Sequence, residues 1–232
     1  LHLTFTMADN PGLSPEVLAR YKAMFRGTFY RRFVLGEWAA AEGLVYDFFG
    51  PELVQPVPES LDGPWYISCD YGTVNPTSMG LWGQKGGVWY RTAEFYYDSR
   101  KTGRQQTDGE YADDLARLAG GRDIRGVVLD PSAASFREEL IRRGWTVYRA
   151  ENEVLSGIRR TAELLRAGQL VICSPCEDAI QEFGLYRWDT AATGDRVVKE
   201  HDHAMDDIRY FAVTVASRRS EGFFAGAVER SG

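Results

Sequence analysis

The segment Trp65–Asp70 constrains the fold of this chain more than any other stretch. Its first three residues are aromatic or β-branched, a proline precedes it and a glycine follows two residues later, so it is predicted to form a β-strand. Alternation along a strand places Tyr66, Ser68 and Asp70 on one face. A carboxylate on a buried strand is costly unless it is paired with a cation or binds a metal ion. The segment therefore predicts a central strand that carries a functional acid.

The length and composition indicate one folded domain with at most a small appendage. The chain has 232 residues, enough for one sizeable core, and its hydrophobic content of 44% excludes global disorder. No apolar run approaches the roughly 18 residues of a membrane span, and no signal-peptide pattern is present, so we expect no membrane association. Because the sequence starts at Leu1 rather than at methionine, we expect it to be part of a longer protein.

The net charge and the cysteines restrict the function further. A net charge of −6 argues mildly against a broadly basic surface for nucleic acid, although clustered acids of a metal site would contribute to that charge. Three cysteines exclude a disulfide framework and favour a reducing compartment. Cys173 and Cys176 have C-x-x-C spacing but lack the second ligand pair of a zinc site. We interpret Ser174–Glu177 as a helix-capping box, with a redox or metal role as the less favoured alternative.

The order of predicted elements defines the fold class. Residues 1–63 are predicted to be a linker and helical segment that wraps a domain of residues 64–220, and residues 221–232 a tail. In the linker a helix begins at Ser14, and a mixed segment covers 29–38. The domain is predicted to have strands at 65–70, 77–83, 87–96, 124–129, 145–149 and 169–173 and helices at 110–118, 133–143, 154–167, 177–187 and 202–217. A polar loop is predicted at 97–108, and a polar hairpin or loop at 188–198. Strands in a meander followed by strands alternating with helices predict an α/β fold with a mixed sheet.

Acidic residues lie at three places where such a fold would form a site. Asp70 ends the first strand of the domain, Asp130 follows the strand 124–129, and Asp206 and Asp207 lie in the first turns of the last helix. Open α/β sheets place ligand sites at the carboxyl ends of their strands. Hard divalent cations prefer oxygen ligands, and two such ions support hydrolysis of a phosphodiester. We therefore expect these acids to converge on divalent metal.

Spacing alone leaves several roles open. Asp207 flanks the apolar stripe of the last helix and Asp206 points further round, so the pattern does not choose between them. His203 is either close to the metal or orients a ligand, and Asp202 is a plausible N-cap. Lys199 and His201 either contact substrate phosphate or are ordinary exposed loop residues. A serine-hydrolase elbow and a P-loop are both absent from the sequence.

Four stretches together resemble the nuclease domain of the large terminase subunit of tailed double-stranded DNA bacteriophages. They are Phe33–Trp38, similar to the segment that links the ATPase and nuclease parts; Asp70–Gly72 with Asn75–Thr77, similar to the first catalytic strand; Asp130–Ala133, similar to the second acid; and Glu200–Asp206 with Arg209 and Tyr210, similar to the closing motif. The last match is the most specific. The resemblance implies an RNase H-like mixed β-sheet flanked by helices, in the group that includes Holliday-junction resolvases.

The resemblance also implies an activity and a set of partners. The activity would be metal-dependent cleavage of concatemeric phage DNA during genome packaging, with two Mg²⁺ or Mn²⁺ ions. Asp70 would bridge the ions, Asp130 would be the second acid and Asp206 the helix acid, with His203 beside it and Asp207 an additional candidate ligand. The partners would be double-stranded DNA, a preceding ATPase domain, the portal protein and the small terminase subunit. The location would be the host cytoplasm, outside the mature virion.

Two other functions fit the same residues. One is a non-catalytic module that docks DNA or the portal, and the other is a junction resolvase of the same fold. Any nuclease of this kind needs a gate, for which the polar segments 97–108 and 188–198 are candidates.

Overall fold

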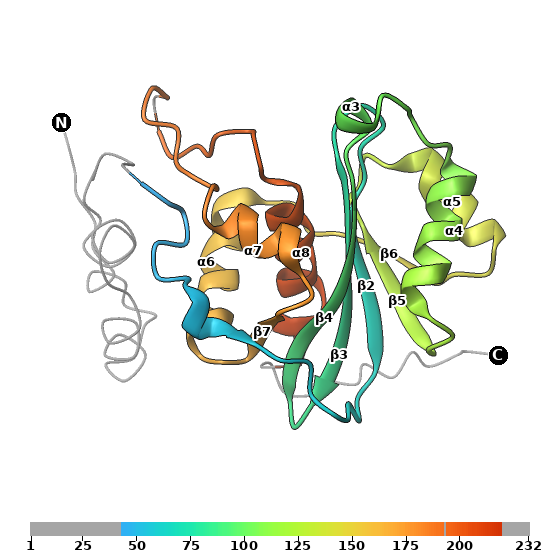
Figure 1. Ribbon diagram of the computed structural model, residues 1–232, viewed down its shortest axis with the longest axis horizontal. Helices are drawn as coiled ribbons and strands as arrows, with labels where there is room; N and C mark the ends of the chain where they lie inside the picture. The colour runs from blue at the N-terminus through green and yellow to red at the C-terminus, as the bar shows by residue number, and fades with distance from the viewer. Residues whose placement is uncertain (1–42, 193, 220–232) are drawn as a thin grey trace, which may run out of the picture.

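The structure is a computed structural model that describes residues 43–192 and 194–219 (Figure 1). The predicted helix from Ser14, the mixed segment 29–38 and the tail 221–232 lie outside the described residues. The predicted boundaries at residues 63 and 220 therefore stay predictions.

One seven-stranded sheet organises the described chain, in the order β1-β7-β4-β3-β2-β5-β6. Its strands are β1 (Val54–Gln55), β2 (Trp65–Asp70), β3 (Thr77–Lys85), β4 (Val88–Tyr97), β5 (Ile124–Leu129), β6 (Val147–Arg149) and β7 (Leu170–Cys173). The pairs β2–β3 and β3–β4 are antiparallel, whereas the other neighbouring pairs are parallel. The predicted mixed α/β sheet is confirmed, and β2 lies in its interior between β3 and β5.

Helices cover both faces of this sheet (Figure 1). On one face lie α4 (Asp108–Ala119) and α5 (Ala134–Arg142), and on the other lie α6 (Val154–Arg166), α7 (Glu177–Phe183) and α8 (His203–Thr214). The short helices are η3 (Pro51–Leu53), α3 (Ser99–Thr102) and η4 (Ala216–Arg219). No helix among the described residues is long and apolar enough to cross a membrane.

The alternation predicted for β2 separates two hydrophobic cores. Ile67 and Cys69 are fully buried in the core beneath α4 and α5. On the opposite face, Tyr66 packs against the core under α8, with its ring centroid 6.3 Å from that of Phe211. Ser68 and Asp70 share this face, so β2 presents its polar atoms to α8.

Two local predictions were wrong, the first because of a local hydrogen bond and the second because of a tertiary contact. The segment 97–108 is not simply a loop, because Asp98 accepts a hydrogen bond from the Arg100 amide (3.0 Å) and starts α3. The predicted capping box at Ser174–Glu177 does not form: the N-cap of α7 is Cys176, without a side-chain cap bond among the described residues. Glu94 of β4 accepts from the Asp178 amide (2.7 Å) instead, and so supplies the acid that helix N-termini favour.

The C-x-x-C cysteines lie in the core as free thiols. Cys173 and Cys176 are both fully buried, and neither forms a disulfide within the described chain. Burial raises the pKa of Cys173 to about 11 and that of Cys176 to about 12. Both thiols therefore stay protonated at neutral pH, which supports the structural interpretation over a redox one.

Candidate metal centre

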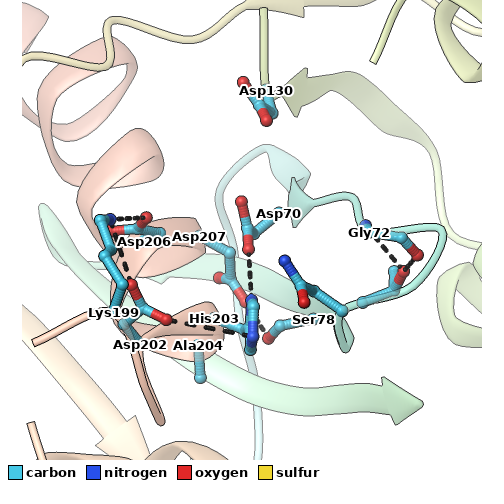
Figure 2. Close-up of polar contacts among 12 residues, drawn as sticks. Asp70, Gly72, Ser78, Asp130, Lys199, Asp202, His203, Ala204, Asp206 and Asp207 are labelled. Atoms are coloured by element: carbon cyan, nitrogen blue, oxygen red, sulfur yellow. Dashed lines mark hydrogen bonds and ion pairs between the residues drawn. The ribbon is translucent and has the colours of Figure 1, made fainter. Parts of the chain in front are cut away.

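The parallel pairing of β2 with β5 brings two of the predicted acids to one edge of the sheet. Cys69 pairs with Leu129, and the Asp130 amide donates to the Cys69 carbonyl (3.2 Å), so Asp70 and Asp130 follow directly at neighbouring strand ends. Figure 2 shows their carboxylates opposite each other. Both line a cavity of about 590 Å³, together with Asp202, His203 and Asp206 from the start of α8.

Asp70 carries a buried charge that the protein compensates only in part. Its side chain is 13% exposed, and it contacts His203 Nδ1 (3.0 Å) and the Tyr210 hydroxyl (3.4 Å). Burial raises the pKa of Asp70 to about 6; the charges of Asp206 and Asp130 add to this, while His203 acts in the opposite direction. A cation bound in the cavity would remove this penalty.

His203 responds to the same contact. Burial alone would lower the pKa of this imidazole, but the hydrogen bond and charge of Asp70 outweigh burial and raise it. The contact between His203 and the Asp70 carboxylate restricts the orientation of that carboxylate.

Asp206 faces the cavity and is already paired with two cations. Arg209 Nη2 lies 2.8 Å from one of its carboxylate oxygens and Lys199 Nζ lies 3.3 Å from the other. The same ammonium lies 3.1 Å from Asp202, so Lys199 bridges two acids (Figure 2). The Lys199 ammonium thus places a positive charge between Asp202 and Asp206. Because the side chain is 61% exposed, it can leave this position when another cation binds there.

Asp207 has a different environment from its neighbour. It is completely buried, and the cavity lining among the described residues includes Asp206 but not Asp207. Its carboxylate accepts from Ser68 (2.8 Å), from Ser78, and from both terminal nitrogens of Arg91, whose side chain is also 0% exposed. One step along a helix turns a side chain by about 100°, so adjacent aspartates reach opposite environments.

The Asp207 contact extends into a chain of buried charges. Arg91 Nη2 lies 3.2 Å from Glu94, which in turn accepts from the amides at the start of α7. Gly80 on β3 leaves room for the guanidinium, since a Cβ at this position would overlap it. The sequence analysis missed Arg91 and Glu94; a charged pair inside a strand of aromatic residues was the available signal.

The N-terminus of α8 is capped by a residue from another helix. Asp202 occupies the predicted N-cap position, but its side chain makes no cap hydrogen bond within the described residues. Glu182 of α7 accepts instead from the Ala204 amide (2.7 Å) and from the Tyr96 hydroxyl (2.7 Å). Asp202 is thereby left for the cavity and for Lys199. Sequence reasoning missed Glu182 because the contact is between helices.

Glu182 makes a pH-dependent contribution to stability that Glu182→Gln is expected to remove. Burial raises the pKa of Glu182 to about 7, and the hydrogen bonds from Tyr96 and Ala204 offset only part of this. The folded state therefore binds a proton that the unfolded state releases above its pKa of about 4.3. Stability from this group falls as pH rises from about 4.3 to about 7, by at most about 1.4 kcal/mol per unit. Urea denaturation of both proteins at pH 5 and 7 measures the difference; an equal pH dependence would contradict the assignment.

The cavity offers the donors that a hard divalent cation needs, in a loose arrangement. No group of three or more His, Cys, Asp or Glu side chains in the described chain is close enough to hold an ion as it stands. The carboxylates of Asp70, Asp130 and Asp206 nevertheless open into one cavity. Three features suit such an ion: the oxygen donors, the charge of Asp70, which its neighbours compensate only in part, and the Lys199 ammonium, which already places a positive charge between two acids.

The fold and the site together define a class of protein. A mixed sheet with helices on both faces, with acids at the ends of two central parallel strands and on the last long helix, is an RNase H-like α/β architecture.

Comparison with solved structures identifies the relatives. The chain is 43% identical to a large terminase from a thermophilic bacteriophage, solved in complex with ADP, with a TM-score of 0.84 over 93% of this chain and 55% of that one. The P22 large terminase nuclease domain matches at 18% identity and a TM-score of 0.61, over 78% of this chain and 95% of that one. The large terminase nuclease from thermophilic phage G20c with bound magnesium matches at 16% identity and a TM-score of 0.56, over 75% and 98%. No family model and no curated protein matches the chain.

The chain belongs with the phage large terminases, in the part that folds as their nuclease domain. It spans about 55% of the length of the ADP-bound large terminase. The likenesses to the P22 and G20c domains show the fold, and the predicted RNase H-like architecture is confirmed.

Proposed function

We propose that this chain is a divalent-metal-dependent endonuclease that cuts double-stranded viral DNA concatemers during genome packaging. The observation that carries the proposal is the cavity that Asp70, Asp130 and Asp206 line together, in a relative of the large terminases. The G20c nuclease, which shares the fold, was crystallised with magnesium and with cobalt.

The three acids are the proposed metal ligands. Asp70, Asp130 and Asp206 line one cavity and would together hold two Mg²⁺ or Mn²⁺ ions. When bound, such ions supply Lewis-acid chemistry: they activate water and stabilise charge on the leaving oxygen. His203 orients the Asp70 carboxylate through its hydrogen bond.

Asp207 is proposed to position this site rather than to bind metal. Within the described chain, the carboxylate of Asp207 contacts Ser68, Ser78 and Arg91, and these contacts hold α8 against β2, β3 and β4. With Asp207 held against the sheet, the turn between adjacent helical residues directs Asp206 toward the cavity.

Basic residues at the cavity rim are proposed to contact the DNA backbone. Arg100 and Lys101 of α3, together with Lys199 and His201, line the same cavity as the acids. Lys101 is 80% exposed and Lys199 61%, so both ammonium groups are accessible to phosphate. Such contacts fix the position of DNA without reading its sequence.

The partners and the location follow the same proposal. We expect the chain to act with a preceding ATPase domain, a portal protein and the small terminase subunit. The expected location is the host cytoplasm, outside the mature virion.

Incubation of supercoiled plasmid with the chain tests the proposal. We expect nicked and linear products with Mn²⁺ or Mg²⁺ and none with excess EDTA. Metal-independent or absent cleavage would contradict an endonuclease and leave the docking-module alternative. Cleavage of four-way junctions far faster than linear duplex would favour a resolvase instead.

Lys199→Ala is expected to tighten metal binding. The ammonium competes with a metal ion for Asp202 and Asp206, so its removal should lower the Mn²⁺ dissociation constant severalfold. Isothermal titration of the DNA-free protein measures this constant, and Lys101→Ala at the same rim is the control. An unchanged or weaker affinity in Lys199→Ala would show that the lysine does not occupy a cation position.

A further inference from the structure

Two further cavities continue from the acidic cavity along the edge of the sheet. The first, of about 500 Å³, shares Asp130 with it and reaches Arg137 of α5 and Arg149 of β6. The second, of about 280 Å³, shares Tyr148 with the first and reaches Arg125 of β5. These shared residues make the three cavities neighbours, and we call the path through Asp130, Arg149, Tyr148 and Arg125 the edge track.

The edge track carries positive charge that the protein leaves uncompensated. Arg125 and Arg149 are exposed, and neither forms an ion pair within residues 43–192 and 194–219. The arginines on the outer surface of α4 and α5 differ, because Arg117, Arg142 and Arg143 are each paired with a carboxylate. Unpaired guanidinium groups beside a metal-binding cavity are suited to bind phosphate.

Tyr148 adds an aromatic surface to the same path. It is 36% exposed, which is unusual for a large ring among the described residues. The ring lies against the sheet over Gly126, where a Cβ would overlap it, and its centroid is 6.4 Å from that of Tyr66. These contacts hold the ring while the residue stays 36% exposed, which suits a stacking platform for a nucleic-acid base.

The position of β6 keeps this path accessible. β6 is the outermost strand of the sheet, is three residues long and pairs only with β5 among the described strands. Asp130, at the end of that neighbouring strand, lies where the edge track joins the acidic cavity. A DNA strand that has one phosphate in the acidic cavity can therefore continue along the edge of the sheet over β6.

We propose that the edge track binds a single-stranded segment of DNA that flanks the cleaved phosphate. Arg149 and Arg125 bind its backbone phosphates, and Tyr148 stacks on one unpaired base. Charge without base-specific donors, combined with an aromatic face, gives binding that tolerates sequence. The inference rests on the proposed nuclease function, which it extends by naming the contacts beyond the metal-binding acids.

Binding of a fluorescently labelled single-stranded oligonucleotide, measured by anisotropy in EDTA over a range of salt concentrations, tests the edge track. Arg149→Ala should weaken binding and reduce the magnitude of the salt slope by about 0.7, since one phosphate contact is lost. Tyr148→Ala should weaken binding on the order of tenfold without changing that slope, and Tyr148→Phe should restore it. Arg142→Ala, whose arginine is paired with Glu139 on α5, is the matched control and should bind like the wild type.

The result that overturns the edge track is equal affinity and salt slope in Arg149→Ala and Arg142→Ala, or wild-type affinity in Tyr148→Ala. Failure of Tyr148→Phe to restore binding would also overturn the stacking role. Because the measurement needs no metal and no cleavage, it is separate from the nuclease test. If the unaltered chain cleaves plasmid but Arg149→Ala binds the oligonucleotide like the wild type, only the edge track is rejected. If Arg149→Ala binds the oligonucleotide more weakly but the unaltered chain does not cleave plasmid, only the nuclease function is rejected.

Discussion

Asp70→Asn is expected to abolish metal-dependent cleavage while making the folded chain more stable. The substitution keeps the shape of the side chain but removes the charge proposed to bridge the metal ions. Loss of several kcal/mol of transition-state stabilisation corresponds to a rate decrease on the order of a thousandfold or more. Plasmid cleavage in Mn²⁺ measures this effect.

The gain in stability follows from the pKa of the same residue. Burial, with the charges of Asp206 and Asp130, raises the pKa of Asp70 to about 6, above the value of about 3.9 in an unfolded chain. The folded state therefore loses stability as pH rises from about 4 to about 6, and at pH 7 the ionised carboxylate opposes folding. Removing the charge should stabilise the metal-free chain by about 1–3 kcal/mol at pH 7.

Urea denaturation of the metal-free chain at pH 7 checks this gain. Asp113→Asn is the matched control, because Asp113 is a surface residue of α4 with a side chain 58% exposed. The control should retain cleavage and lie within about 0.5 kcal/mol of the wild type in stability. Cleavage by Asp70→Asn at the wild-type rate would remove the proposed ligand from the mechanism, whatever its effect on stability.

Asp207→Asn and Asp206→Asn are expected to differ in their effect on metal binding. Asp207→Asn removes one of the two carboxylates paired with the buried Arg91 and leaves Glu94 as the other; breaking this buried ion pair should cost about 3–5 kcal/mol of stability. The Asp206 side chain is 11% exposed and faces the cavity, so Asp206→Asn should weaken Mn²⁺ binding strongly, which is not expected of Asp207→Asn. Urea denaturation and isothermal titration with Mn²⁺ separate the two effects.

A double substitution distinguishes positioning from ligation at Asp207. Arg91→Met with Asp207→Leu removes this ion pair, while Glu94 keeps its hydrogen bond from the Asp178 amide of α7; replacement of a buried pair by apolar residues is often neutral or stabilising. The double variant should therefore recover most of the stability that Asp207→Asn loses. It should also bind Mn²⁺ more tightly than Asp206→Asn, since the proposed ligands remain. Mn²⁺ binding as weak as that of Asp206→Asn, in a stably folded double variant, would make Asp207 a ligand.

The elements that were predicted well depend on short stretches of chain. The strand at 65–70 and the strand at 124–129 match β2 and β5 residue for residue, because β propensity and flanking turns are local signals. The helix predicted at 154–167 matches α6 to within one residue, since its apolar spacing repeats over several turns. The helix predicted at 177–187 ends earlier, at Phe183, directly before Gly184.

The sequence by itself determined the class of fold and the three places from which the acids come, because periodicity, propensity and motif spacing act between near neighbours. Only the tertiary structure decided which acid faces the cavity: the contacts of Asp207 with Ser68 and Arg91 join residues 139 and 116 positions apart. The cap that Glu182 provides for α8 and the bridge that Lys199 makes between two acids depend likewise on how the elements pack. The 3.6-residue repeat of a helix determines the relative directions of its side chains but not what packs against each of them. Those contacts are decided only when the sheet and helices pack together.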